Sequence, residues 1–316
     1  MLKILGKRKN VNPCLVITKN QNSWVIGGLI REAAKSIGRN FDIFYVVERR
    51  LKLQNPIHYM NFFRIGKRNQ VLFAHQKLFI RYVESYKPKS KVFKVFVTHL
   101  SGTDLVDLAR YDQFVSTYLV MNSEVERKLY ESGISKSKIV KVYGAVDEKL
   151  YYPTGTSKNY VLIVGKYSAR KNGDTIKQVV SSNPNIEFII HGDGWGEVFN
   201  KTVLPNLRIY PFEISRNPKL LSESSCLLSI SEIEGGPITV LEALSCGIPV
   251  VGSNTGFIPE LIKGNFGLLV NDHLDIKEIS QCLIRILDNL DLYRGDKLLE
   301  IDVSFSRFGK QILNGW

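Results

Sequence analysis

Short apolar runs alternate with longer amphipathic segments along most of the chain. Apolar runs of four to seven residues predict buried strands. In the first half these are Cys14–Thr18, Phe41–Val47, Val71–Ala74, Val92–Thr98, Val115–Met121 and Ile139–Tyr143. In the second half they are Tyr160–Val164, Ile186–His191, Leu207–Tyr210, Ser225–Ile230 and Ile248–Gly252. Helical spacing predicts a helix at Trp24–Ile37 and another from Glu124, capped by Asn122-Ser123.

This order of elements predicts an α/β protein, because strands that alternate with helices form parallel sheets. The segment Tyr152–Asn159 is rich in turn-forming residues and lacks periodicity, so it is the best candidate for a linker. We therefore predict two Rossmann-like domains facing a central cleft, residues 1–152 and 153–298, and a last helix within 299–316. Ligands of such sheets bind outside the carboxyl ends of the strands.

The composition is that of a globular protein: 316 residues, 44% of them hydrophobic, suffice for two domains with a core each. No apolar run approaches the roughly 18 residues that span a bilayer. Residues 1–10 lack the apolar stretch of a signal peptide. The four cysteines are scattered without metal-ligand spacing. We expect a protein of the reducing cytoplasm that binds no metal.

The formal net charge of +13 is concentrated in the first half. Residues 1–152 contain 27 Lys and Arg against 12 Asp and Glu, a net charge of +15; residues 153–316 contain 16 against 18, a net charge of −2. A fold does not require this asymmetry, which indicates an anionic partner of the first domain. The segment Tyr59–Arg68 interleaves basic and aromatic residues, as in peripheral membrane contacts. A solvated basic face is the alternative interpretation.

Two glutamates, Glu234 and Glu242, stand eight positions apart on either side of Gly235-Gly236-Pro237. The glycines permit a tight turn that brings the backbone close to a ligand. Pro237 suits the first position of a helix. The free N–H groups at the N-terminus of that helix form an anion site. This arrangement suits a ligand with a phosphate in its middle and hydroxyl groups at both ends.

Two further motifs follow predicted strands. Lys166 and Lys171 come after Gly165, where two ammonium groups would neutralise a diphosphate leaving group. A basic surface loop is the alternative. His191-Gly192-Asp193-Gly194 predicts a turn whose backbone lies near the cleft. It lacks the complete G-x-G-x-x-G pattern of dinucleotide-binding folds.

The stretch from Glu234 to Val251 resembles the Glu-x7-Glu signature of retaining glycosyltransferases of family 4, which have the GT-B fold. The resemblance implies that residues 153–298 bind a nucleotide-sugar, that residues 1–152 bind the acceptor, and that the last helix crosses back to the N-terminal domain. It extends over roughly residues 115–275 through Asn122–Asp147, Gly165–Lys171, His191–Gly194, Ser253–Glu260 and Gly267–Val270.

The resemblance also assigns roles to individual residues. Glu234 is expected to contact the transferred sugar as a catalytic residue, and Glu242 the ribose hydroxyls. A histidine of the N-terminal domain is expected near the sugar; His99 is the first candidate and His75 the second. The remaining expected donor-binding residues are Lys166, Lys171, Gly235, Gly236, Ile238 and Thr239.

The chain departs from the family pattern at two positions. Lys166 stands where Arg is usual, which keeps the charge but loses the bidentate geometry of a guanidinium group. Pro237 stands where many members have Gly, which removes one amide donor.

These features predict a retaining hexosyltransferase (EC 2.4) that transfers a sugar from a nucleotide-sugar. We expect no metal and no cofactor, since no Asp-x-Asp metal motif occurs. In the resembling enzymes the leaving phosphate deprotonates the acceptor hydroxyl. The expected acceptor is a lipid-linked glycan or a surface polysaccharide such as lipopolysaccharide, reached at the inner face of an anionic cell membrane.

Two alternatives stay open. One is a sugar-nucleotide epimerase of GT-B-like fold. The other, from a different class, is a basic nucleic-acid-binding protein, suggested by the sequence pI near 9.4. Because no RNA- or DNA-binding motif occurs in the sequence, nucleic acid is not an expected partner.

Overall fold

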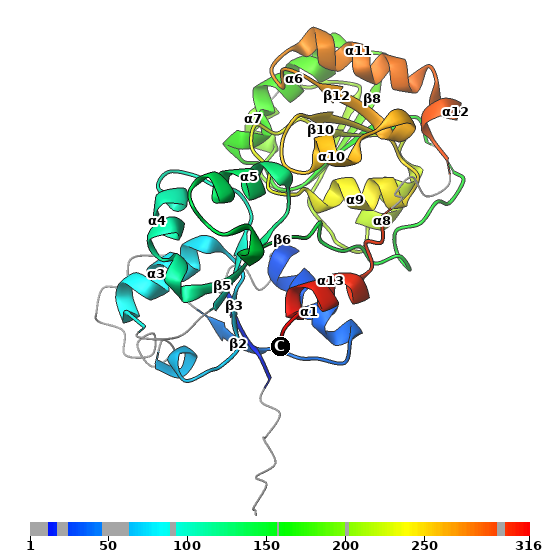
Figure 1. Cartoon of the computed structure of the whole chain (residues 1–316). Coiled ribbons are helices and arrows are strands. Elements are labelled where there is room, and N and C mark those ends of the chain that lie inside the picture. The colour runs from blue at the N-terminus through cyan, green and yellow to red at the C-terminus, as the bar shows by residue number, and fades with distance from the viewer. Residues whose placement is uncertain are drawn as a thin grey trace, which may run out of the picture. The chain divides into compact units, whose positions relative to one another are not determined.

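The computed structural model describes residues 12–17, 25–45, 63–88, 93–156, 158–199, 202–295 and 301–316. The described chain divides into two compact units: unit 1 contains the residues up to Val120, 126–140 and 309–316, and unit 2 contains Met121–Val125 and Lys141–Phe308 (Figure 1). Several predicted positions lie outside the described residues: 1–10, Thr18, Trp24, 46–47, 59–62, Val92, Ser157 and 299–300.

Unit 1 is built on a six-stranded sheet of order β2-β1-β3-β4-β5-β6, in which the pairs from β2 to β5 are parallel. The predicted strands of the first half are confirmed, with ends that differ by one or two residues. The strands are β1 (Cys14–Ile17), β2 (Asp42–Tyr45), β3 (Val71–Phe73), β4 (Phe93–Val97), β5 (Val115–Val120) and β6 (Ile139–Lys141). The helices are α1 (Val25–Ser36), α3 (Gln76–Tyr86), α4 (Asp104–Arg110), and α5 (Ser123–Glu131) and α13 (Phe305–Leu313), which both begin in unit 2.

One face of this sheet is closed by an aromatic cluster. Phe73 of β3 and Phe93 of β4 pack against Phe79 and Tyr82 of α3, with ring centroids between 5.3 and 6.2 Å apart. All four side chains are fully buried or nearly so. Edge-to-face rings of this kind add to the free energy that burial of their area already contributes. The cluster therefore fixes α3 over β3 and β4.

The other face of β4 anchors the end of α13. Because side chains alternate along a strand, Lys94 points away from its neighbour Phe93. Its Nζ donates to the carbonyl oxygen of Ile312 (3.0 Å) and lies 4.5 Å from the ring centroid of Trp316. Burial lowers the pKa of Lys94 to about 8. In α13, a Cβ on Gly309 would lie 2.2 Å from the carbonyl oxygen of Ala33, so only glycine permits this contact with α1 (Figure 1).

Unit 2 contains a second six-stranded sheet of order β12-β11-β10-β7-β8-β9, with every neighbouring pair parallel. The predicted strands of the second half are confirmed. The strands are β7 (Tyr160–Val164), β8 (Glu187–His191), β9 (Leu207–Tyr210), β10 (Cys226–Ser229), β11 (Val250–Ser253) and β12 (Gly267–Val270). The helices are α6 (Gly173–Ser182), α7 (Gly196–Phe199), α8 (Asn217–Glu223), α9 (Ile238–Ser245), α10 (Ile258–Leu261), α11 (Ile276–Leu287) and α12 (Leu290–Tyr293).

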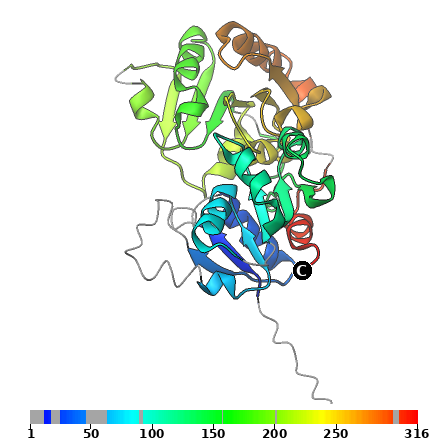
Figure 2. The same cartoon turned by 60° about the vertical axis from the view of Figure 1, so that its left-hand side comes forward.

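Helices cover both faces of this sheet (Figures 1 and 2). Helices α6 and α11 pack on one face over a buried core, whereas α8 and α9 lie on the other. The chain enters at β7 in the middle, runs outward to β9, and returns to β10 on the other side of β7. The connections after β7 and β10 thus leave in opposite directions, and the carboxyl ends of these strands form a switch point where ligands of such folds bind.

Residues 121–125 and 141–152, which the sequence assigns to the first domain, belong to unit 2. The N–H of Val146 donates to the carbonyl oxygen of Val303 (2.9 Å), and the Tyr151 hydroxyl accepts from Asn217 (3.1 Å). The two-domain α/β fold class is confirmed by the two parallel sheets with their helices. Within the described ranges, no helix combines the length and the apolar character needed to cross a membrane.

Candidate donor-binding site

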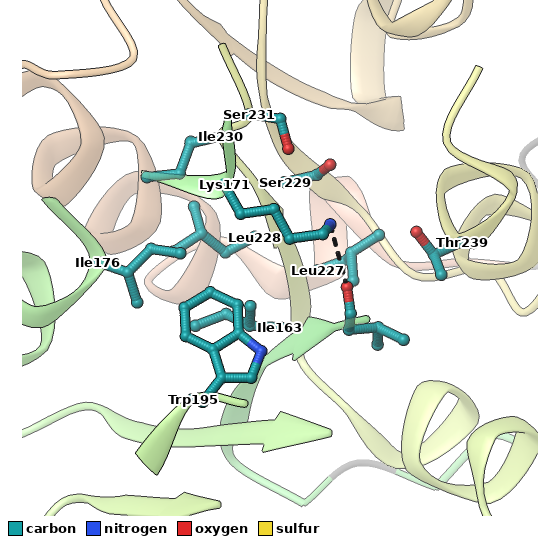
Figure 3. Close-up of a pocket in the computed structure, with 11 residues that line it drawn as sticks. Ile163, Lys171, Ile176, Trp195, Leu227, Leu228, Ser229, Ile230, Ser231 and Thr239 are labelled. Carbon is teal, nitrogen blue, oxygen red and sulfur yellow. Dashed lines mark hydrogen bonds between the residues drawn. The ribbon is translucent and has the colours of Figure 1, made fainter. Parts of the chain in front are cut away.

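A pocket lies at the switch point of unit 2, between the carboxyl ends of β7 and β10 (Figure 3). Its polar side chains are Lys171, Ser229, Ser231 and Thr239, and Ile176 and Trp195 contribute apolar surface. In Figure 3 the Lys171 side chain reaches toward the carbonyl oxygen of Val164, 3.5 Å from Nζ. The pocket therefore contains a cationic side chain, Lys171, at the carboxyl end of a parallel sheet.

The loop after β7 is fixed by close backbone contacts. Gly165 has φ +113°, which an L-residue with a side chain rarely adopts. Its N–H donates to the carbonyl oxygen of His191 (3.0 Å), and its carbonyl oxygen accepts from Trp195 Nε1 (2.8 Å). A Cβ on Gly192 would lie 2.0 Å from the same carbonyl oxygen. Gly192 is thus required in the His191–Gly194 turn, because a side chain there would collide with the backbone of the loop after β7.

Asn172 sets the direction in which this loop leaves the pocket. Its φ of +53° lies in the left-handed region, which Asn tolerates better than most residues. Its Nδ2 donates to the carbonyl oxygen of Ile230 at the end of β10 (2.7 Å). The preceding short 3₁₀ turn, Ala169–Lys171, is therefore held against the switch point, which places Lys171 in the pocket.

The Glu234 carboxylate lies among donors. Its Oε1 accepts from Ser231 Oγ (2.9 Å), forms an ion pair with the Arg170 guanidinium, and lies 3.7 Å from Lys171 Nζ. Only 12% of the Glu234 side chain is exposed. Burial lowers the pKa of Lys171, while the negative charge of Glu234 opposes that shift. Three donors thus converge on a single oxygen of this carboxylate.

The helix beyond this turn begins one residue later than the sequence predicts. Pro237 has ψ 104°, so it is the N-cap in an extended conformation rather than the first helical residue, and α9 starts at Ile238. The carbonyl oxygen of Pro237 already accepts from the N–H of Val240 (2.9 Å), as an N-cap does. The N–H groups of Ile238 and Thr239 have no helical partner upstream, so they remain as donors at the helix mouth.

The two glycines before Pro237 are held by the chain itself. The carbonyl oxygen of Gly235 accepts from Asn122 Nδ2 (2.6 Å). A Cβ on Gly236 would lie 2.4 Å from the ring of Phe257 and 2.6 Å from the terminal carbon of Met121. The sequence predicts that these glycines let the backbone approach a ligand, whereas the close neighbours of Gly236 are side chains of unit 2.

The second carboxylate, Glu242, lies in a different environment. Its Oε2 accepts from Asn217 Nδ2 (3.1 Å), and the Tyr151 hydroxyl also bonds to the carboxylate. Burial raises the pKa of Glu242 to about 7, although both hydrogen bonds act in the opposite direction. Neutral donors therefore hold this group, in contrast to the cations at Glu234.

The structure brings only some of the predicted site residues together. Lys171 and Thr239 line the pocket, and Glu234 contacts Lys171 of its lining. Glu242 lies four residues after the start of α9, beside Asn217 and Tyr151. Lys166 is exposed and is not part of the pocket lining. Within the described residues, no group of three or more His, Cys, Asp or Glu side chains is arranged to hold a metal ion.

The two candidate histidines are neighbours in unit 1. Their rings, His75 after β3 and His99 after β4, have centroids 5.9 Å apart. His75 caps α3, because its Nδ1 accepts from the N–H of Lys77 (3.1 Å), and burial lowers its pKa to about 4. His99 is half-buried, with Nδ1 3.1 Å from Thr98 Oγ1. A helix cap thus accounts for His75.

Four residues at these sites escape the sequence analysis: Arg170, Ser231, Asn217 and Tyr151. Arg170 precedes Lys171 in the sequence, but only the 3₁₀ turn shows that its guanidinium reaches Glu234. Asn217 and Tyr151 are far from Glu242 along the chain, and no spacing pattern connects them. Asn217 reaches Glu242 because α8 packs against α9, and Tyr151 reaches it from the segment between β6 and β7.

Parts of the chain are similar to known glycosyltransferases. Residues 152–295 match the family model "Glycosyl transferases group 1". The chain is 30% identical over 208 residues to the uncharacterized 41.2 kDa protein in the cps region of Klebsiella pneumoniae. This alignment covers 57% of this chain and 58% of that protein. It is 29% identical over 178 residues to the O-antigen biosynthesis glycosyltransferase WbnH of Escherichia coli, which covers 56% and 52%. The chain thus spans about half the length of the curated relatives it matches.

The fold is shared over nearly the whole chain. The crystal structure of Anabaena Alr3699/HepE in complex with UDP-glucose superposes with a TM-score of 0.71 at 14% identity, covering 95% of this chain and 94% of that one. At this identity the likeness shows the two-domain fold.

Proposed function

From the glycosyl transferases group 1 pattern of residues 152–295 and the GT-B fold of the chain, we propose that this protein is a nucleotide-sugar-dependent glycosyltransferase. The observation that carries the proposal is the meeting of Lys171 Nζ, the Glu234 carboxylate and the N-terminus of α9 at the switch point of unit 2. A cation and free backbone N–H groups suit a diphosphate, and a carboxylate beside them suits sugar hydroxyls.

In this proposal the donor extends along the start of α9. Its diphosphate lies at Lys171 and at the N–H groups of Ile238 and Thr239, where positive charge is available. The transferred sugar lies at Glu234 and the ribose at Glu242. Glu234 lies in the loop before α9, and Glu242 lies four residues after the start of the helix, about 6 Å along its axis at 1.5 Å per residue. This order suits a ligand with the diphosphate between two hydroxyl-bearing rings.

The proposed reaction retains the configuration of the sugar and uses no metal. The bond between the anomeric carbon and the phosphate oxygen breaks, and the acceptor oxygen forms the new bond on the same face. The acceptor proton passes to the leaving phosphate, so no strong general base is needed. Lys171 stabilises the charge that develops on the diphosphate, a contribution worth about 10²–10³ in rate for one such donor.

We propose a lipid-linked glycan or surface polysaccharide as the acceptor, met at the inner face of a membrane in the cytoplasm. Support comes from the net charge of +15 in residues 1–152 and from relatives described by O-antigen biosynthesis and a cps region. In unit 1, Phe63 is 49% exposed, with Lys67 Nζ 4.3 Å from its ring centroid. Such a basic and aromatic pair suits an anionic lipid surface.

Labelled nucleotide-sugars incubated with undecaprenyl-linked or lipopolysaccharide acceptors test the activity. We expect transfer by the wild type, and a loss of at least about 100-fold for Lys171→Ala or Glu234→Gln. Exposed Lys219→Ala is the matched lysine control. A donor isomerised without transfer would support the epimerase instead, and unchanged transfer by both variants would overturn the proposed site.

Vesicle binding tests the membrane contact separately. Sedimentation with phosphatidylserine vesicles should exceed that with phosphatidylcholine vesicles and should fall as salt is raised. Equal, salt-insensitive sedimentation with both vesicle types would contradict a membrane-bound acceptor while leaving the donor site untouched.

A further inference from the structure

We propose that Asn217 is a positioning residue for Glu242, and that His191 fixes the orientation of the Asn217 amide. This inference rests on the proposed donor site, in which Glu242 receives the ribose hydroxyls. It adds the residues that decide how the carboxylate is presented. Both are deeply buried: His191 is 0% exposed and Asn217 is 3% exposed.

The protonation of His191 follows from a backbone donor. The N–H of Glu213 donates to His191 Nε2 (3.0 Å), so Nε2 carries no proton. The neutral imidazole must then carry its proton on Nδ1, which lies 3.2 Å from Asn217 Oδ1. Burial lowers the pKa of His191 and keeps the ring neutral. Phe212 stacks on the same ring with centroids 5.0 Å apart, which holds its plane.

The amide of Asn217 then has a single satisfactory orientation. Its Oδ1 accepts from His191 Nδ1–H, so its Nδ2 must point the other way. That nitrogen donates to the Tyr151 hydroxyl (3.1 Å) and to Glu242 Oε2 (3.1 Å). A reversed amide would set its oxygen against the Glu242 carboxylate and its NH₂ against the imidazole N–H. The N–H of Glu213 can only donate, so it fixes the proton on His191 and thereby the orientation of the Asn217 amide. As a result the NH₂ of Asn217, and not its oxygen, faces Glu242.

The consequence for the ligand is a carboxylate with one oxygen already occupied. A carboxylate offers about four acceptor sites, of which Asn217 uses one, on Oε2, and the Tyr151 hydroxyl uses another. The remaining capacity suits the two neighbouring hydroxyls of a ribose. The titratable groups that face this network are Tyr151, Cys246 and, beyond Cys246, Arg294 on the Glu242 side. On the His191 side they are Asp193, Glu213 and Arg216.

Calorimetric binding of UDP, GDP and ADP, each beside its 2′,3′-dideoxy analogue, tests the inference. Wild type should bind at least one ribonucleoside diphosphate about tenfold more tightly than its dideoxy analogue, because the diol bonds to Glu242. Asn217→Asp removes the donor and sets a second carboxyl group beside Oε2. The variant should abolish the preference for the ribonucleotide. The rise of nucleotide affinity with pH should also shift to higher pH, because the second carboxyl group raises the pKa of Glu242.

Two further variants complete the test. Tyr151→Phe removes one hydroxyl only and should reduce the preference about threefold, which keeps the inference testable if Asn217→Asp does not fold. Asn183→Asp is the matched control: this buried asparagine donates to the carbonyl oxygen of Val179 (2.7 Å) and to Ser280 Oγ (2.8 Å), so it should lose stability and keep the preference.

The outcomes separate the inference from the function on which it rests. If wild type binds none of the nucleotides, the proposed donor site is wrong and the inference fails with it. If Glu242→Gln loses the ribose preference while Asn217→Asp and Tyr151→Phe keep both the preference and the pH profile, the donor site stands and the positioning role is overturned.

Discussion

Glu234 and Glu242 are the same residue type on one short motif, yet the protein surrounds them in opposite ways. Glu234 lies beside Arg170 and Lys171, so its negative charge is compensated by neighbouring cations. Among the described residues, the neutral donors Asn217 and Tyr151 hold Glu242, and burial raises its pKa to about 7. Environments that separate two carboxyl groups in this way commonly give them different tasks. Cations thus surround Glu234, whereas Glu242 is an acceptor oriented by neutral groups.

The largest expected effect that tests this contrast comes from Glu242→Gln. The folded-state pKa of about 7 lies above the ordinary value of 4.5, so the folded protein holds a proton that the unfolded chain releases. Stability from this group is therefore present below pH 4.5 and is lost as pH rises toward 7. Gln does not ionise, so its free energy of unfolding does not fall in this way. Between acidic and alkaline pH, the free energy of unfolding of the variant should therefore rise by up to about 3 kcal/mol relative to that of wild type.

Urea unfolding at about pH 5 and about pH 8 measures this difference. Exposed Glu232→Gln, on the loop before α9, controls for the loss of one carboxyl group. An equal stability difference between wild type and Glu242→Gln at both pH values would contradict the contrast. Nucleotide affinity should fall in the same variant, since its amide replaces a charged acceptor for the ribose hydroxyls.

A smaller effect is expected at the other carboxylate. Arg170→Ala leaves Glu234 with Ser231 and Lys171 alone, and turnover should fall about tenfold with little change in the donor KM. Arg170→Lys should recover part of the loss, because it restores the charge without the guanidinium fork. Steady-state kinetics with a labelled donor give both parameters.

Arg208→Ala is the matched control for that variant, since Arg208 also pairs with a glutamate of unit 2, Glu187, at 3.6 Å. It should leave kcat unchanged. A rise in donor KM at constant kcat in Arg170→Ala would show instead that the guanidinium binds the donor and does not orient Glu234.

The smallest expected effect belongs to Ser231→Ala. This change removes one of the three donors to Glu234 Oε1 (2.9 Å) and leaves both cations in place. Turnover should fall about threefold, the order expected for a single hydrogen bond to a partly compensated charge. Ser222→Ala, whose hydroxyl bonds to the carbonyl oxygen of Lys219, should show no change in the same assay. A loss as large as that of Arg170→Ala would mean that the hydroxyl dominates the orientation.

The sequence predicts the fold well, because strand positions depend on local apolar patterns. Runs such as Val161–Val164 and Ile186–Ile190 can be buried only inside a sheet, and the order of elements then leads to parallel pairing. The start of α9 is off by one residue, because the ring of Pro237 fixes φ while ψ is left to the surrounding turn.

The site is predicted less completely, for a physical reason. Glu234 and Glu242 belong to one motif and Lys171 to another, and all three can be recognised by their neighbours in the sequence. Asn217 and Tyr151 reach Glu242 only through tertiary packing, and the pKa of Glu242 depends on burial that spacing does not reveal. Sequence motifs therefore locate the charged residues of the site but not the side chains that orient them.

The anchoring of the last residues on unit 1 has a consequence for how the protein is made. Lys94 is 3% exposed and contacts Ile312 and Trp316, and Gly309 fits against Ala33. During synthesis from the N-terminus, all of unit 2 emerges from the ribosome before these residues do. Domains usually fold in the order of their synthesis. Here the earlier half completes its core last, and until then the Lys94 ammonium remains open to water.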